Sequence, residues 1–81
     1  MGGSQVRTRH APMDVRHRVG LNLQALRRAK GLSQEELAHQ SGVHQTYLSG
    51  VERGRRNPTV GLLDKIASAL DADVEDLTRR R

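Results

Sequence analysis

The side chains best suited to chemistry in this sequence lie between His44 and Asn57. Residues 53–57 read RGRRN, and their guanidinium groups can bind phosphate through charge and paired hydrogen bonds. Residues 44–49 read HQTYLS, and amide and hydroxyl groups of this kind can hydrogen-bond the edges of bases. The question is whether this segment is an element that reads nucleic acid.

The charge of the whole chain favours a polyanionic partner. The 81 residues include 14 basic and 9 acidic side chains, which give a formal net charge of +5. Four of the acids fall within residues 71–76, so the rest of the chain is more basic than the average. Charge alone supports a nucleic-acid partner and a merely solvated basic surface about equally.

The sequence gives little support for catalysis or for a metal or cofactor site. The histidines do not follow a metal-ligand spacing, there is no cysteine, and no serine lies in a nucleophile motif. Acidic pairs lie where helix N-termini favour negative charge. No apolar segment is long enough to span a bilayer, and no signal-peptide pattern is present. We expect a soluble, cytoplasmic protein without enzymatic activity or cofactor.

Apolar spacing predicts an all-α fold of five short helices, with no strand pattern. The first helix ends near Gly31, and its apolar stripe consists of Val15, Val19, Leu23 and Leu26. The second covers about residues 34–41 behind a capping box formed by Ser33 and Glu36. After a turn of about three residues at Gly42, the third covers about residues 44–53.

Two further helices complete the predicted domain. Thr59 can cap the fourth, whose stripe consists of Val60, Leu63, Ile66, Ala67 and Leu70. Asp73 can cap a short fifth helix that carries Val74 and Leu77. We divide the chain into a flexible basic arm over residues 1–12, a domain over 13–78 and an arginine tail over 79–81. Residues 1–4 read MGGS and could be a cloning remnant.

Residues 31–70, GLSQEELAHQSGVHQTYLSGVERGRRNPTVGLLDKIASAL, resemble the Cro and phage-repressor type of helix-turn-helix domain, also called the XRE family. With the flanking helices included, the resemblance covers about residues 15–77. It implies a compact, lambda-repressor-like bundle of five helices in which the second and third form the helix-turn-helix. Transcriptional regulators and restriction-modification controllers have such domains.

The resemblance implies a role for each matching residue. Base contacts fall to Gln45, Thr46 and Ser49. Contacts with the DNA backbone fall to Gln34, His44, Tyr47, Arg53, Arg55, Arg56 and Asn57. Arg27 and Glu52 match an ion pair that joins the first predicted helix to the third. For Tyr47, a ring that covers the edge of the core is an equal alternative.

These roles predict a sequence-specific, double-stranded DNA-binding transcriptional regulator, either a repressor or an autoregulatory controller. One recognition helix in the major groove reads only a few base pairs, so we expect a homodimer on a palindromic operator. Its candidate contacts are Leu62, Val74 and Leu77. The alternatives are an antitoxin or bridging-type interaction module that also binds DNA, and non-specific binding of RNA or an anionic surface.

Gly50 interrupts the predicted reading face with a residue that costs about 1 kcal/mol of helix stability relative to alanine. Many members of the family have a longer polar side chain at this position. Either the missing Cβ lets the backbone approach the groove closely, or base readout is confined to the first turn of the helix. We favour the second explanation, in which the flanking arginines hold the complex.

Overall fold

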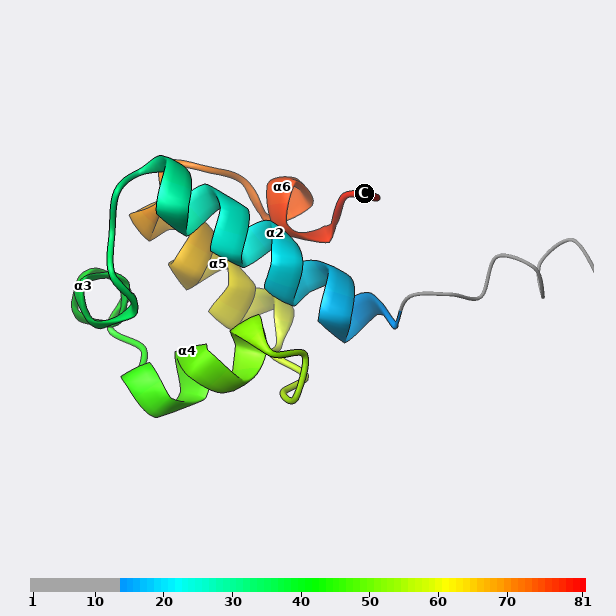
Figure 1. The fold of residues 1–81 in the computed structure, drawn as a ribbon, viewed down its shortest axis with the longest axis horizontal. Helices are drawn as coiled ribbons and strands as arrows, with labels where there is room; N and C mark the ends of the chain where they lie inside the picture. Colours follow the sequence, from blue (N-terminus) through cyan, green and yellow to red (C-terminus); the bar gives the residue numbers. More distant parts are fainter. Residues whose placement is uncertain (1–13) are drawn as a thin grey trace, which may run out of the picture.

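The computed structural model describes residues 14–81, and this part of the chain consists of α-helices and connecting turns (Figure 1). The helices are α2 (Val15–Ala29), α3 (Gln34–Ser41), α4 (Gln45–Glu52), α5 (Val60–Ala69) and α6 (Val74–Thr78). The predicted all-α fold of five helices is therefore confirmed. The predicted arm over residues 1–12 lies outside the described residues.

The α2 helix contacts both α4 and α6. Asp14 caps its first turn, because the Asp14 carboxylate accepts a hydrogen bond from the Arg16 amide at 2.8 Å. Further along, Gly20 allows a close approach: a Cβ on Gly20 would lie 2.5 Å from the Glu52 carbonyl oxygen. The end of α4 is therefore packed directly against the backbone of α2.

A tight turn joins α3 to α4, as the sequence predicts. Ser33 Oγ accepts a hydrogen bond from the Glu36 amide at 3.0 Å, and the Glu36 carboxylate accepts one from the Ser33 amide at 2.8 Å. The predicted capping box is thus present at the start of α3. Gly42 follows α3 with φ of 75°, a left-handed conformation that glycine adopts without strain. Buried Val43 then fixes the turn to the core.

The core is aliphatic and draws on each of these helices. Its most completely buried side chains are Leu23, Leu37, Leu48, Val51, Ile66 and Leu77. The α5 helix contacts α3 and α6, and the Thr59 hydroxyl caps α5 by accepting a hydrogen bond from the Leu62 amide at 3.1 Å. Within residues 14–81, none of the helices has the length and apolar character needed to cross a membrane.

Leu77 is wrong as a candidate dimer contact. Its side chain is 0% exposed, because α6 packs between α2 and α5 and directs Leu77 into the core. Leu62 and Val74 are half-buried and pack against the same core. The apolar side chains that do reach the surface include Val15 and Val60, which are 49% and 72% exposed.

Asn22 fastens the C-terminal residues to α2. Its Nδ2 donates to the carbonyl oxygens of Leu77 at 2.8 Å and Arg79 at 2.9 Å, and its Oδ1 accepts from Arg81 Nη1 at 2.8 Å. The Asn22 side chain is buried, and these three bonds satisfy its polar atoms. The predicted arginine tail is therefore hydrogen-bonded to the bundle.

Candidate nucleic-acid interface

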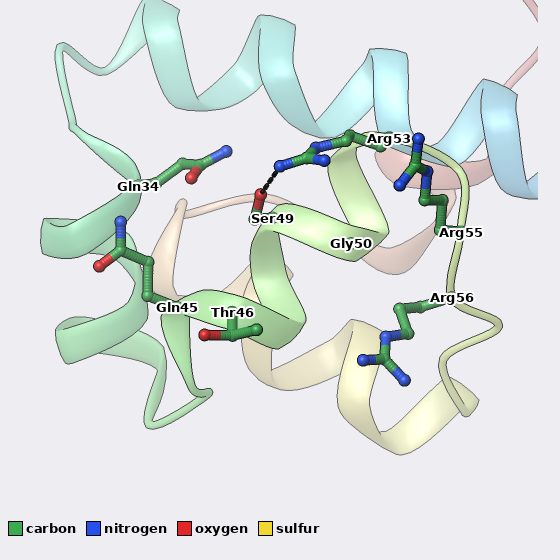
Figure 2. A pocket seen from close by; sticks show the side chains of 8 residues that line it. All are labelled: Gln34, Gln45, Thr46, Ser49, Gly50, Arg53, Arg55 and Arg56. Atoms are coloured by element: carbon green, nitrogen blue, oxygen red, sulfur yellow. Dashed lines mark hydrogen bonds between the residues drawn. The ribbon is translucent and has the colours of Figure 1, made fainter.

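Side chains from α3, α4 and the loop after α4 surround an open pocket of about 490 Å³ (Figure 2). The lining residues are Gln34, Gln45, Thr46, Ser49, Gly50, Arg53, Arg55 and Arg56. Carboxamide and hydroxyl groups therefore lie beside guanidinium groups on one surface. The three residues predicted to contact bases all line this pocket, together with four of the seven predicted to contact the DNA backbone.

A buried ion pair joins α2 to the end of α4, the helix that contributes the three base-contact candidates in the pocket. Arg27 Nε donates to Glu52 Oε2 at 2.6 Å and Arg27 Nη2 donates to Glu52 Oε1 at 3.0 Å, so the expected pair is present and bidentate. Hydrogen bonding to the Glu52 carboxylate raises the pKa of Arg27 above its ordinary value. Gln34 Nε2 also donates to Glu52 Oε1, at 2.9 Å. Glu52 is only 4% exposed, so its carboxylate is a fixed partner. The hydrogen bond to it holds the Gln34 side chain at the edge of the pocket.

Two supporting residues on α2 were missed by the sequence analysis. Gln24 Nε2 donates to the Glu52 carbonyl oxygen at 2.8 Å, and Gly20 allows the same carbonyl to approach α2. Both lie at helical spacing from Arg27, on the face of α2 that meets α4. That spacing is the sequence signal that could have identified them.

Residues 53–57, which we call the arginine loop, fold back toward α4. Gly54 adopts φ of 74°, and the Arg55 amide donates to the Gly50 carbonyl oxygen at 2.8 Å, so α4 ends in a tight turn. Arg53 Nη2 donates to Ser49 Oγ at 3.2 Å, as Figure 2 shows. The loop therefore presents its guanidinium groups beside the hydroxyl and amide groups of α4.

Arg56 lies across α4 at the position of Gly50. Its guanidinium carbon is 5.3 Å from the centroid of the Tyr47 ring, within the range of a cation–π interaction. The Tyr47 ring packs against the core, so the alternative in which the ring covers the core edge describes the structure. A phosphate contact by the Tyr47 hydroxyl stays a prediction.

Besides Tyr47, two predicted backbone contacts lie outside the pocket. His44 is the residue before the first turn of α4, and its side chain makes no capping hydrogen bond. Asn57 ends the arginine loop. Both side chains are exposed, and their contacts with DNA stay predictions.

The pocket has an excess of positive charge. Within residues 14–81, the ion pairs join Arg16 to Asp14, Arg27 to Glu52 and Lys30 to Asp71. The arginine loop takes no part in any of them, so its charges are not neutralised by a carboxylate of the described chain. In the same part of the chain, no cluster of side chains could hold a metal ion. The surface is therefore suited to a nucleic acid, whose phosphates are negatively charged and whose bases offer hydrogen-bonding groups at their edges.

Comparison with known proteins identifies this arrangement, because the family model described as helix-turn-helix matches residues 23–77. The chain belongs to the helix-turn-helix family. An uncharacterized HTH-type transcriptional regulator of Sinorhizobium fredii, y4dJ, is 59% identical over 58 residues, which cover 72% of this chain and 75% of the relative.

Two solved structures extend the comparison. The restriction-modification controller protein C.AhdI from Aeromonas hydrophila is 47% identical and superposes with a TM-score of 0.74, covering 76% of this chain and 94% of that one. SinR, described as the master regulator for biofilm formation, has been solved in complex with DNA. It is 38% identical, with a TM-score of 0.70 and coverage of 73% of this chain and 95% of that one.

The helix-turn-helix of this protein consists of α3, the Gly42 turn and α4. The resemblance found in residues 31–70 is therefore confirmed, as is the compact bundle that it implied. In a helix-turn-helix the second helix of the motif reads the major groove, and here that helix is α4.

Proposed function

We propose that this protein is a transcriptional regulator that binds specific double-stranded DNA sequences by inserting α4 into the major groove. One observation supports the proposal: Gln45, Thr46 and Ser49 line the same pocket as the arginines of the arginine loop. No carboxylate of the described chain neutralises these arginines. Its similarity to C.AhdI, a restriction-modification controller, and to SinR, which was solved with DNA, supports the same function.

Each part of the pocket then has a distinct task. Gln45 offers a carboxamide that can pair bidentately with adenine, and Thr46 offers a methyl group to thymine. Ser49 lies one helical turn beyond Gln45 and adds a hydroxyl group. These three residues provide the sequence preference.

The remaining polar residues supply affinity and register. Gln34 lies in the first turn of α3, where backbone amides also favour a phosphate. The arginine loop, which ends at Asn57, binds the sugar–phosphate backbone. His44 and Tyr47 complete this set from the first turn of α4. Such contacts are the same for every base sequence, so their loss should weaken all duplexes similarly.

We further propose that two copies bind a palindromic operator as a repressor or an autoregulatory controller. Paired recognition helices lie about one helical turn of DNA apart, roughly 34 Å. Half-buried Leu62 and Val74 remain candidate contacts between the copies. Exposed Val60 is the first residue of α5, the helix that contains Leu62. Such a regulator would act in the cytoplasm of a prokaryote, on the nucleoid, without a cofactor.

Selection of bound duplexes from a random pool tests the proposal. We expect an enriched inverted repeat that the protein prefers over random DNA by roughly 10³-fold or more. Sedimentation on that duplex should show two copies, and on a single half-site one. Equal affinity for all duplexes and for RNA would contradict sequence-specific regulation, whereas a single copy on the enriched duplex would contradict the dimer alone.

A further inference from the structure

The first turn of α2 lies directly beside the arginine loop. A Cβ on Gly54 would lie 3.0 Å from His17 Cα and 3.3 Å from His17 N, so the backbones of the two segments are in contact. In Figure 1 the start of α2 and the loop after α4 lie at the same end of the molecule. The surface formed by the arginine loop therefore continues onto α2.

His17 occupies the end of the α2 face that meets α4. Gly20, Gln24 and Arg27 follow it at intervals of three, seven and ten residues, and all three touch Glu52, the last residue of α4. On a helix these positions form one stripe. His17 extends this stripe past the end of α4 to Gly54, and its side chain is exposed.

The neighbouring cations of the first turn are already engaged. Arg16 pairs with Asp14 at 2.8 Å, and Arg18 Nε donates to the Thr78 carbonyl oxygen at 3.0 Å. Hydrogen bonds from the Arg16 side chain and amide lower the pKa of Asp14 to about 2, so this carboxylate stays ionised and bound to Arg16. Within residues 14–81, His17 takes part in no ion pair.

The charged residues next to His17 in sequence, and next to Gly54 in the loop, are mostly basic. Its own helix contributes Arg16, Arg18 and the engaged Asp14, and the adjoining loop contributes Arg53 and Arg55 on either side of Gly54. An imidazole N–H placed among these groups is suited to a phosphate oxygen, which accepts hydrogen bonds and is drawn to the local positive charge.

We infer that His17 contacts a DNA phosphate next to those held by the arginine loop, so that the backbone interface includes the first turn of α2. The inference rests on the proposed DNA-binding function. His17 lies outside α3, α4 and the arginine loop. It is exposed, whereas Gly20, Gln24 and Arg27, the other members of its stripe, are buried or half-buried.

The test compares His17→Gln and His17→Arg with a matched control, His39→Gln, on the selected duplex. His39 is an exposed histidine in the last turn of α3 and does not line the pocket. His17→Gln should weaken binding to all duplexes by about two- to fivefold. It should also reduce the salt slope of binding by about 0.9, the value for one phosphate. His17→Arg should restore both quantities, and His39→Gln should leave both unchanged.

A scan of methylphosphonate substitutions along the same duplex locates the contact. One neutralised phosphate should weaken the wild-type protein but have no further effect on His17→Gln. Unchanged affinity and salt slope in His17→Gln, or identical scans for the two proteins, would overturn the inference while the proposed function stands. If the wild-type protein itself prefers no duplex, the proposed function fails and the inference fails with it.

Discussion

The Arg56 side chain occupies the space that Gly50 leaves beside α4. A Cβ on Gly50 would lie 2.8 Å from Arg56 Cγ and 3.1 Å from Arg56 Nε. Neither sequence-based explanation of Gly50 included this contact, because each considered only the DNA side of the helix. Glycine at this position allows Arg56 to reach Tyr47.

Gly50→Ala should therefore displace Arg56 from Tyr47 and weaken binding to all duplexes by about two- to fivefold. In an Arg56→Ala background the same change should not affect DNA binding, and it should raise the free energy of unfolding by up to about 1 kcal/mol, as alanine does inside a helix. A double-mutant cycle of affinity and urea unfolding measures both effects. Additive losses of affinity would show that Gly50 and Arg56 act independently.

Gly20 and Gly61 form a matched pair for testing helix packing. A Cβ on Gly20 would lie 2.5 Å and 2.6 Å from backbone oxygens of Glu52 and Val51, whereas one on Gly61 would meet only the Thr59 hydroxyl at 3.9 Å. Gly20→Ala should destabilise the fold by about 1–3 kcal/mol, because overpacking forces α2 and α4 apart. Gly61→Ala should stabilise it by about 0.5–1 kcal/mol. Urea unfolding measures both, and equal effects at the two positions would contradict the close approach of α2 and α4.

Breaking the Arg27–Glu52 pair by removing one partner should destabilise the protein more than replacing both residues with apolar ones. Glu52→Ala leaves the Arg27 guanidinium, whose side chain is 12% exposed, without its carboxylate. The free energy of unfolding should fall by about 3–5 kcal/mol, and the double variant Arg27→Met, Glu52→Leu should recover much of that loss. Urea titration provides the values. A double variant as unstable as Glu52→Ala would mean that the loss arises from packing or from Gln34 rather than from an unpaired charge.

Asp14 should make the stability of α2 depend on acid pH. Its pKa in the folded protein is lowered from 3.8 to about 2, first by the Arg16 side chain and then by the Arg16 amide. Because the folded pKa lies below the unfolded one, this stabilisation is fully present above about pH 4 and is lost as pH falls through about 2.

Asp14→Asn isolates the charge, since asparagine is also a good helix cap. The variant should be less stable than the wild type at pH 6, and the difference should shrink toward zero near pH 2. Chemical unfolding at several pH values measures this difference, with Asp64→Asn on the exposed side of α5 as the control. A difference that stays constant with pH would rule out the ionised carboxylate as its source.

Much of the fold was predictable because its signals are local. The Ser33/Glu36 box and the left-handed Gly42 depend on neighbours in sequence, and the structure contains both. The predicted apolar stripe of α5 is buried from Leu63 to Leu70, but Val60, its first member, is 72% exposed. The family resemblance also brought together Arg27 and Glu52, which lie 25 positions apart in the chain.

The missed features depend on contacts between distant segments. The bonds from Asn22 to Leu77 in α6 and to Arg79 after it could not be inferred from α2 alone, since an asparagine in a helix gives no sign of its partner. Leu77 was misjudged for a related reason: a leucine in a five-residue helix can face the core or the surface, and only packing against α2 and α5 decides. The contact of Gly50 with Arg56 likewise depends on how the arginine loop folds back.

Gln45 and Arg55 should separate base readout from backbone affinity. Gln45 lies in the first turn of α4, where its carboxamide can select one base, whereas Arg55 lies in the arginine loop beside the phosphates. Gln45→Ala should lose about 1–3 kcal/mol on the selected duplex and relax the preference at one base position. Arg55→Ala should weaken selected and random duplexes alike and lower the salt slope by about one. Affinities measured on the selected duplex, its single-base variants and random DNA distinguish the two patterns. If Arg55→Ala relaxed one position while Gln45→Ala weakened every duplex equally, the reading face would lie at the arginine loop and the assignment of α4 would be wrong.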